Sequence, residues 1–177
     1  MMPLVAIVGR PNVGKSTLFN RIIGEKKAIV LDTPGVTRDR NYGEASWRKR
    51  NFNIVDTGGF EPKAQEGVTA AMRRQAMLAV DEADAVLFVT DARDGLMTAD
   101  REVAAILRQA ECPVLYVVNK VDSRVQEGEA AEFYKLGADE IFPVSAEHGL
   151  GVGRLLDELI GHFSKVVADE ANSGLTR

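Results

Sequence analysis

The sequence predicts an α/β fold: a mostly parallel six-stranded sheet with one antiparallel edge strand and helices on both faces. Two observations lead to this prediction. Short apolar runs rich in Val, Leu, Ile and Phe show no polar alternation, which is typical of strands buried on both faces. Helical patterns separate these runs along the chain, as expected for parallel strands. The runs are 4–8, 85–90, 114–118 and 141–144.

The remaining two strands form a predicted hairpin. Residues 42–47 and 52–55 are strand-like and flank the polar stretch 48–51, so the chain is expected to reverse there and to supply the antiparallel strand. Apolar residues at helical spacing predict the helices, the first of which follows residue 16. The others cover 99–109, with Thr98 as the N-cap, about 125–135, and 152–163.

The chain is predicted to form one domain over residues 1–165. Its 177 residues, 45% of them hydrophobic, are enough to bury a core without disulfides or a structural metal. Segments 25–40 and 58–68 have little periodicity and predict long loops, which are often functional in compact domains. Residues 166–177 offer little to bury and are interpreted as a frayed helix end or linker.

Composition excludes several classes of function. The net charge of −4 and the pI near 5.3 argue against a generally basic surface, so a DNA partner is not expected and any RNA contact would be local. Cys112 is the only cysteine, which fits a reducing compartment. No apolar run approaches the length of a membrane span, and the first residues lack a signal peptide pattern. We therefore expect a cytoplasmic protein without membrane contact.

A phosphate-binding loop follows the first predicted strand. Residues 9–16 read Gly-Arg-Pro-Asn-Val-Gly-Lys-Ser, and their glycines let successive N–H groups point at phosphate oxygens. Lys15 is placed to reach the β- and γ-phosphates, and the Ser16 hydroxyl to bind the Mg²⁺ that bridges them. The alternative is a glycine-rich turn before an ordinary helix. The predicted nucleotide-binding residues here are Gly9, Asn12, Val13, Gly14, Lys15, Ser16 and Thr17.

A second motif, residues 56–59, ends the predicted strand 52–55. Because the ends of parallel strands share one crevice, the Asp56 carboxylate is expected near the phosphate loop. Asp56 would hold Mg²⁺, through a bound water, and the Gly59 N–H would meet the γ-phosphate. A simple strand-end turn is the alternative for this short pattern.

The base is predicted from residues 119–122, which follow the apolar run 114–118. The Asp122 carboxylate can accept hydrogen bonds from the N1–H and the exocyclic amine of guanine. Adenine lacks both donors on that edge, so it would leave the carboxylate unpaired. Taken alone, the tetrapeptide would also suit a helix cap.

Three further contacts to the nucleotide site are predicted. The aliphatic stem of Lys120 would cover the face of the base, and Asn119 would tie this loop to the phosphate loop. Ser145 and Ala146 follow the last predicted strand, where a backbone N–H would meet the guanine O6. Together these residues predict a guanine nucleotide, GTP or GDP.

The order of these motifs resembles the translation-factor-related class of small GTPases over residues 4–163, and therefore a P-loop NTPase fold. Residues 9–21, 32–39 and 56–60 are more specifically similar to the first GTPase domain of the Der (EngA) family of bacterial ribosome-assembly GTPases, in the TrmE-Era-EngA-like class. This resemblance implies that Thr37 senses Mg²⁺ and the γ-phosphate.

The resemblance also implies a longer protein and a ribosomal partner. Family members carry two tandem GTPase domains and a small RNA-binding-type domain, so the chain is interpreted as a fragment whose tail begins an interdomain linker. The implied partner of the full-length protein is the large ribosomal subunit or its rRNA.

The sequence departs from Ras-like enzymes at Phe60, which stands where those enzymes keep a water-positioning glutamine. In related GTPases without this glutamine, an asparagine at the position of Asn12 helps to bind a potassium ion across the phosphates. We therefore expect Asn12 to be a potassium ligand, although it could simply shape the loop. The expected catalytic set is Lys15, Asn12, Thr37 and Gly59.

The expected function is a switch that binds and slowly hydrolyses GTP in ribosome biogenesis. Two alternatives remain. A nucleotide-gated binding module with negligible turnover is suggested by the missing glutamine. A small-molecule kinase would need an arginine-rich lid and an acceptor site, and the sequence indicates neither.

Overall fold

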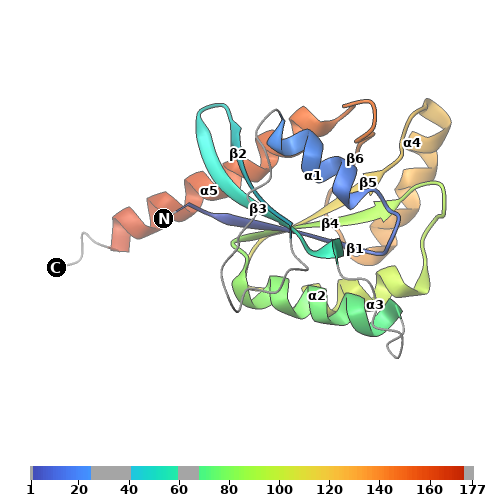
Figure 1. The fold of residues 1–177 in the computed structure, drawn as a ribbon, viewed down its shortest axis with the longest axis horizontal. Coiled ribbons are helices and arrows are strands. Elements are labelled where there is room, and N and C mark those ends of the chain that lie inside the picture. The colour runs from blue at the N-terminus through green and yellow to red at the C-terminus, as the bar shows by residue number, and fades with distance from the viewer. Residues whose placement is uncertain (1, 25–40, 60–67, 174–177) are drawn as a thin grey trace.

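The computed structural model describes residues 2–24, 41–59 and 68–173, and it has the predicted α/β architecture (Figure 1). The strands are β1 (Leu4–Gly9), β2 (Asn41–Trp47), β3 (Arg50–Asp56), β4 (Ala85–Asp91), β5 (Val114–Asn119) and β6 (Ile141–Pro143). The α-helices are α1 (Lys15–Ile23), α2 (Val68–Glu82), α3 (Thr98–Leu107), α4 (Arg124–Ala130) and α5 (Val152–Ser173), and the 3-10 segments are η1 (Thr57–Gly59) and η2 (Ala131–Leu136).

The six strands form one sheet in the order β2-β3-β1-β4-β5-β6. All neighbours pair in parallel except β2 and β3, which form the antiparallel hairpin at the edge. The prediction of a mostly parallel sheet with one antiparallel edge strand is therefore confirmed. Because the parallel strands run in the same direction, the segments that follow them meet at a single edge of the sheet.

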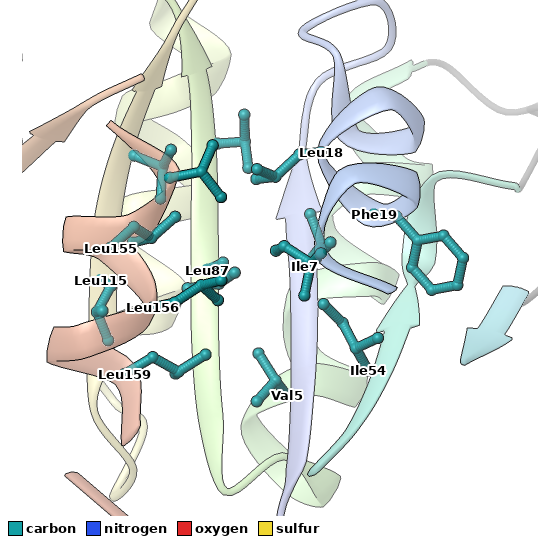
Figure 2. Close-up of a cluster of buried hydrophobic side chains, with 14 of the residues drawn as sticks. Val5, Ile7, Leu18, Phe19, Ile54, Leu87, Leu115, Leu155, Leu156 and Leu159 are labelled. Carbon is teal, nitrogen blue, oxygen red and sulfur yellow. The ribbon is translucent and has the colours of Figure 1, made fainter. Parts of the chain in front are cut away.

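The core has two layers, one on each face of the sheet. Alternate residues of a strand enter opposite layers, so both layers need apolar side chains and the strand sequences lack polar alternation. In β1, Val5 and Ile7 pack under α1 and α5, whereas Ala6 and Val8 face α2 and α3. Figure 2 shows the first layer, in which Leu155 and Leu159 of α5 pack beside Leu87 of β4. These two packed layers hold the parallel strands in place, and so fix the end of the sheet at which the loops after those strands converge.

Helix α2 was not predicted from the sequence. Its buried stripe consists of Ala71, Met72, Ala76 and Ala79, and alanine gives little hydrophobic contrast against the polar face. The helix nevertheless covers the second layer beside α3 (Figure 1). The expected loop 58–68 in part lies outside the described residues.

Three helix ends also differ from the expectation. Helix α3 begins at Thr98, so its N-cap is Met97 rather than Thr98. The Met97 N–H donates to Asp100 Oδ2 at 3.0 Å. The expected helix over 125–135 is divided into α4 and η2. Helix α5 continues past Phe163 to Ser173, and the proposed domain boundary at residue 165 stays a prediction. Among the described residues, no helix combines the length and apolar character needed to cross a membrane.

Candidate guanine-nucleotide site

Two adjoining hollows lie where the loops after the parallel strands meet. One has a volume of about 460 Å³ and is lined by Pro11, Asn12, Gly14, Lys15, Ser16, Thr17, Gly58 and Lys120. The other, of about 300 Å³, is lined by Gly14, Thr17, Arg93, Asn119, Lys120, Asp122, Ser145 and Glu147. We call them the phosphate hollow and the base hollow. They share Gly14, Thr17 and Lys120, so a single ligand can extend through both.

The phosphate loop adopts the tight turn that its sequence predicts. Asn12 and Gly14 have φ values of 66° and 97°, in the left-handed region that glycine adopts readily and asparagine tolerates. A Cβ at position 14 would meet the side-chain amide of Asn119. The glycine therefore allows both the backbone turn and the approach of the next loop.

Lys15 lies folded onto its own loop, with Nζ donating to the carbonyl oxygens of Gly9 at 2.5 Å and Arg10 at 2.7 Å. Burial lowers the pKa of this ammonium to about 8, against the opposing charge of Asp56 and with a smaller contribution from the Arg10 guanidinium. The two carbonyl oxygens hold the ammonium at the edge of the phosphate hollow. An anion there would offer it stronger acceptors.

Ser16 and Asp56 meet across the sheet, with the Ser16 hydroxyl donating to Asp56 Oδ2 at 3.1 Å. The other carboxylate oxygen, Oδ1, accepts the Gly58 N–H at 2.8 Å, and Asp56 is buried. A hydroxyl and a carboxylate oxygen side by side form the kind of oxygen donor set that Mg²⁺ prefers. The residues therefore fit a magnesium ion. Gly59 ends η1, directly after this pair.

Asn119 links the phosphate loop to the last loop of the site. Its Nδ2 donates to the Val13 carbonyl at 2.9 Å, and its Oδ1 accepts the Ala146 N–H at 3.0 Å. The first contact is the predicted tie to the phosphate loop. The second differs from the expectation, because the Ala146 N–H is already paired with a protein acceptor. A guanine O6 would have to share this donor or take the place of the amide oxygen.

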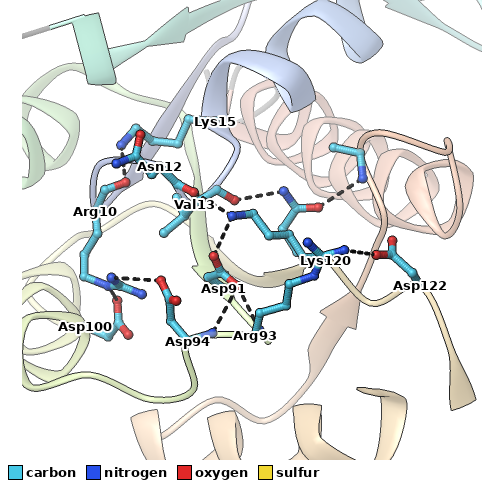
Figure 3. A network of polar contacts seen from close by, with 12 residues as sticks. Arg10, Asn12, Val13, Lys15, Asp91, Arg93, Asp94, Asp100, Lys120 and Asp122 are labelled. Carbon is cyan, nitrogen blue, oxygen red and sulfur yellow. Dashed lines mark hydrogen bonds and ion pairs between the residues drawn. The ribbon is translucent and has the colours of Figure 1, made fainter. Parts of the chain in front are cut away.

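Lys120 bridges three loops (Figure 3). Its backbone is left-handed, with a φ of 66°, and its Nζ contacts Asn12 O at 2.8 Å and Asp91 Oδ2 at 2.7 Å. The ammonium is anchored at both contacts, so the aliphatic stem is held between the two hollows. This placement suits the predicted role of covering the face of a base.

The Asp122 carboxylate lies in the base hollow with a donor on each oxygen. Ser145 Oγ donates to Oδ1 at 2.6 Å, and Arg93 Nη2 donates to Oδ2 at 2.7 Å. These two hydrogen bonds hold the pKa of Asp122 below its usual range. The group is therefore an ionised acceptor at neutral pH, as recognition of guanine requires.

The described residues bring together the predicted site, with one exception. Those that converge at the sheet edge are Gly9, Asn12, Val13, Gly14, Lys15, Ser16, Thr17, Asp56, Gly59, Asn119, Lys120, Asp122, Ser145 and Ala146. Thr37 lies outside the described residues, as does Phe60.

Sequence reasoning missed Asp91 and Arg93, which follow β4. The rule that placed Asp56 and Asn119 at the sheet edge applies equally to the run 85–90, so the signal was present. It also missed Arg21 of α1, whose guanidinium donates to the carbonyl oxygens of Ala146 at 3.0 Å and Glu147 at 2.6 Å.

Residues at the hairpin tip and on α2 have partners elsewhere in the fold. At the hairpin tip, Trp47 Nε1 and Arg48 Nε both donate to Asp157 of α5, at 2.8 and 2.6 Å. Arg73 of α2 forms an ion pair with Glu102 of α3 at 3.7 Å.

A buried ion pair supports the phosphate loop from below. Arg10 Nε donates to Asp100 Oδ1 at 2.9 Å, and Asp100 is fully buried while 11% of the Arg10 side chain is exposed. Burial raises the pKa of Asp100, against hydrogen bonds from Met97 and Arg10 that lower it. The pair joins the loop that carries Lys15 to the start of α3.

We expect Arg10→Met to lower the free energy of unfolding by about 3 kcal/mol, because it leaves a buried carboxylate without its cation. The folded-state pKa of Asp100 is already raised and would rise further, so stability is lost as pH rises through that pKa. The loss of stability relative to the unsubstituted chain, measured by urea denaturation, should be larger at pH 7 than at pH 5.

Adding Asp100→Asn to the Arg10→Met variant should recover part of the lost stability. A control, Arg154→Ala, removes an exposed ion pair and should change stability by less than about 0.5 kcal/mol; an equal loss would contradict the buried-pair account.

The comparisons with known proteins agree with this geometry. The family described as 50S ribosome-binding GTPase matches residues 4–120. A GTPase Der from Geobacter sp. (strain M21) is 53% identical over 177 residues, which are 100% of this chain and 40% of that protein. The chain thus spans about two fifths of the length of such relatives. In extent and similarity it matches the first GTPase domain of Der proteins, as the sequence resemblance predicted.

Two solved structures of Era share the fold. A point variant of Aquifex aeolicus Era bound to GDP.AlF4⁻ is 32% identical, with a TM-score of 0.72, and the match covers 91% of this chain and 56% of that one. Era in complex with MgGDPNP and nucleotides 1506–1542 of 16S ribosomal RNA is 32% identical, with a TM-score of 0.69, covering 92% of this chain and 57% of that one. With the phosphate and base hollows described above, these matches place the chain in the 50S ribosome-binding GTPase family.

Proposed function

We propose that this chain binds GTP and GDP and hydrolyses GTP to GDP and phosphate. The observation that carries the proposal is the pair of hollows joined at Gly14 and Lys120, with an ionised carboxylate, Asp122, at the base end. Guanine offers its N1–H and its exocyclic amine to that carboxylate, whereas at the same two positions adenine has an acceptor nitrogen and a C–H. The geometry therefore supports a guanine nucleotide over an adenine nucleotide.

Hydrolysis would depend on positioning and charge. Lys15 would leave the carbonyl oxygens of Gly9 and Arg10 and turn its ammonium to the β- and γ-phosphate oxygens, where it offsets charge that develops in the transition state. Mg²⁺, bound through Ser16 and Asp56, would add positive charge to the same oxygens. Water accepts the phosphoryl group, so no covalent intermediate is needed.

Two further roles are proposed from the sequence. Thr37 would supply a second hydroxyl for Mg²⁺, and the Gly59 N–H would bind the γ-phosphate. Gly59 lies in the short 3-10 segment that directly follows Asp56, which supports its part of this proposal. Both residues would then respond to loss of the γ-phosphate, which is the basis of a switch.

We further propose that Asn12 holds a potassium ion against the phosphates. Asn12 lines the phosphate hollow. Its backbone is left-handed, and this position belongs to no strand or helix, so its side-chain amide oxygen can be presented to a ligand in the hollow. Phe60 has no hydrogen-bonding group with which to position a water. A monovalent cation there would add to the positive charge that Lys15 brings to the phosphates.

Hydrolysis in two salts tests these proposals. GTP turnover should be about tenfold or more faster in potassium than in sodium at matched ionic strength, because an additional charge stabilises the transition state. Asn12→Ala should abolish this difference, and the exposed control Asn51→Ala should keep it. GTP binding without turnover in either salt would favour a nucleotide-gated binding module. Turnover that is equal in both salts would refute the potassium site while leaving the GTPase intact.

For the whole protein we propose a role in ribosome biogenesis in the cytoplasm. The family description names the 50S subunit, and one Era structure contains a 16S rRNA fragment. The chain's own charge of −4 disfavours a broad RNA-binding surface. The large ribosomal subunit or its rRNA would then be bound with help from parts of the protein beyond this domain.

A further inference from the structure

Arg93 enters the base hollow from the loop after β4. Its backbone N–H donates to Asp91 Oδ1 at 2.8 Å, and Asp91 is buried at the end of β4. The same Asp91 carboxylate binds Lys120 through its other oxygen. The start of the Arg93 side chain is therefore fixed by the residue that also fixes Lys120, and the guanidinium is directed over the hollow (Figure 3).

The Arg93 guanidinium contacts the carboxylate that is expected to recognise the base. Nη2 lies 2.7 Å from Asp122 Oδ2, while Ser145 Oγ occupies Oδ1. A guanidinium presents planar N–H donors to a carboxylate, and the recognition edge of guanine presents its N1–H and amine in the same manner. Arg93 thus makes the contact that the edge of guanine would make.

We propose that Arg93 competes with a guanine base for the Asp122 carboxylate and is displaced when the base binds, so that it sets the affinity for the nucleotide. This inference rests on the proposed function, because Asp122 must be the group that recognises the base. Arg93 is then a competitor built into the chain, and it acts on the free state of the protein rather than on the complex.

The exposure of the two side chains sets the size of the effect. Arg93 is 57% and Asp122 23% exposed, and exposed ion pairs are weak because water and salt screen them. The base can therefore displace the guanidinium easily. Removing Arg93 should strengthen nucleotide binding by about two- to fivefold.

The test is the binding kinetics of a fluorescent GDP analogue with Mg²⁺. Arg93→Ala should bind about two- to fivefold more tightly than the wild-type chain at low ionic strength. The gain should appear in the association rate, because Arg93 must leave the carboxylate before the base can bind, and the dissociation rate should stay unchanged. The gain should shrink at high salt, where the ion pair is screened.

Two control variants sharpen this test. Arg154→Ala removes the same charge from an exposed ion pair with Glu140 outside both hollows, and should leave both rates unchanged. Arg93→Lys keeps the charge but loses the planar fork, and should fall between the wild-type chain and Arg93→Ala. Circular dichroism confirms that each variant is folded.

The outcomes separate this inference from the proposed function. If the wild-type chain fails to bind GDP, the proposed function fails and the inference fails with it. If the wild-type chain binds GDP and Arg93→Ala has the same affinity, only the inference is overturned. A faster dissociation rate in Arg93→Ala would also overturn it, because Arg93 would then contact the bound nucleotide.

Discussion

Replacing Lys15 by alanine is expected to slow GTP hydrolysis by about 100- to 1000-fold. This range is typical when one preorganised donor to a developing negative charge is removed. The fold should persist, because the variant removes an ammonium whose pKa is depressed by burial and whose hydrogen bonds, among the described residues, go to carbonyl oxygens of its own loop. Single-turnover hydrolysis with saturating enzyme measures the effect, and circular dichroism checks the fold. A loss of less than tenfold would contradict the proposed role.

The pKa of Lys15, about 8, also predicts how binding depends on pH. Below pH 8 the Lys15 amine is protonated and its ammonium pairs with phosphate. Above it, a growing fraction must take up a proton to bind, so the affinity for GDP should fall by up to tenfold for each pH unit. Lys15→Arg keeps the charge at every pH tested, so its affinity for GDP should not fall above pH 8. This variant therefore separates titration of Lys15 from titration of the guanine base. An identical pH profile in the variant would assign the fall in affinity to another group.

Replacing Asp122 by alanine is expected to weaken GDP binding by at least about 100-fold while affinity for ADP changes little. A site built to accept hydrogen bonds discriminates strongly between ligands that have the donors and ligands that lack them. Competition titrations with both nucleotides measure the ratio of the two affinities. Asp157→Ala is the matched control: this exposed carboxylate also has Trp47 and Arg48 as donors, and its pKa is likewise lowered by them. Unchanged GDP binding in the Asp122 variant would refute base recognition by this group.

The sheet and most of the site could be predicted because their signals are local. A strand buried on both faces must be apolar along its length, and this requirement located four of the six strands; the polar turn between two strand-like segments located the hairpin that supplies the other two. The motifs after β1, β3 and β5 then fell at a single edge, because parallel strands end together. The phosphate loop could also be predicted from a local signal, because its turn needs a glycine at position 14, where φ is 97°.

What the sequence did not reveal depends on pairs that are distant along the chain. Arg10 and Asp100 are 90 residues apart, and Arg93 and Asp122 are 29 apart. Nothing in the local pattern distinguishes these charged side chains from solvated ones. A backbone N–H of Ser145 or Ala146 was expected to meet the base, but the Ala146 N–H pairs with Asn119 and the Ser145 N–H with Leu150, because buried N–H groups find partners within the fold. Helix α2 was missed because its buried face is built largely from alanine.

Several contacts within the two hollows have one consequence for binding. Lys15 pairs with loop carbonyl oxygens, Ser16 with Asp56, and Asp122 with Arg93. Each contact uses a group that the nucleotide or its magnesium ion would also use. Binding therefore exchanges contacts within the protein for contacts to the ligand, and the net affinity is the difference between the two sets.

The most direct test of a guanine-nucleotide site is a calorimetric titration of the 177-residue chain with GDP and with ADP, each in the presence of Mg²⁺. We predict saturable binding of one GDP per chain and at least about 1000-fold weaker binding of ADP, because adenine leaves the Asp122 carboxylate unpaired. Equal affinity for the two nucleotides would contradict base recognition at Asp122. Absence of GDP binding by a folded chain would contradict the account as a whole.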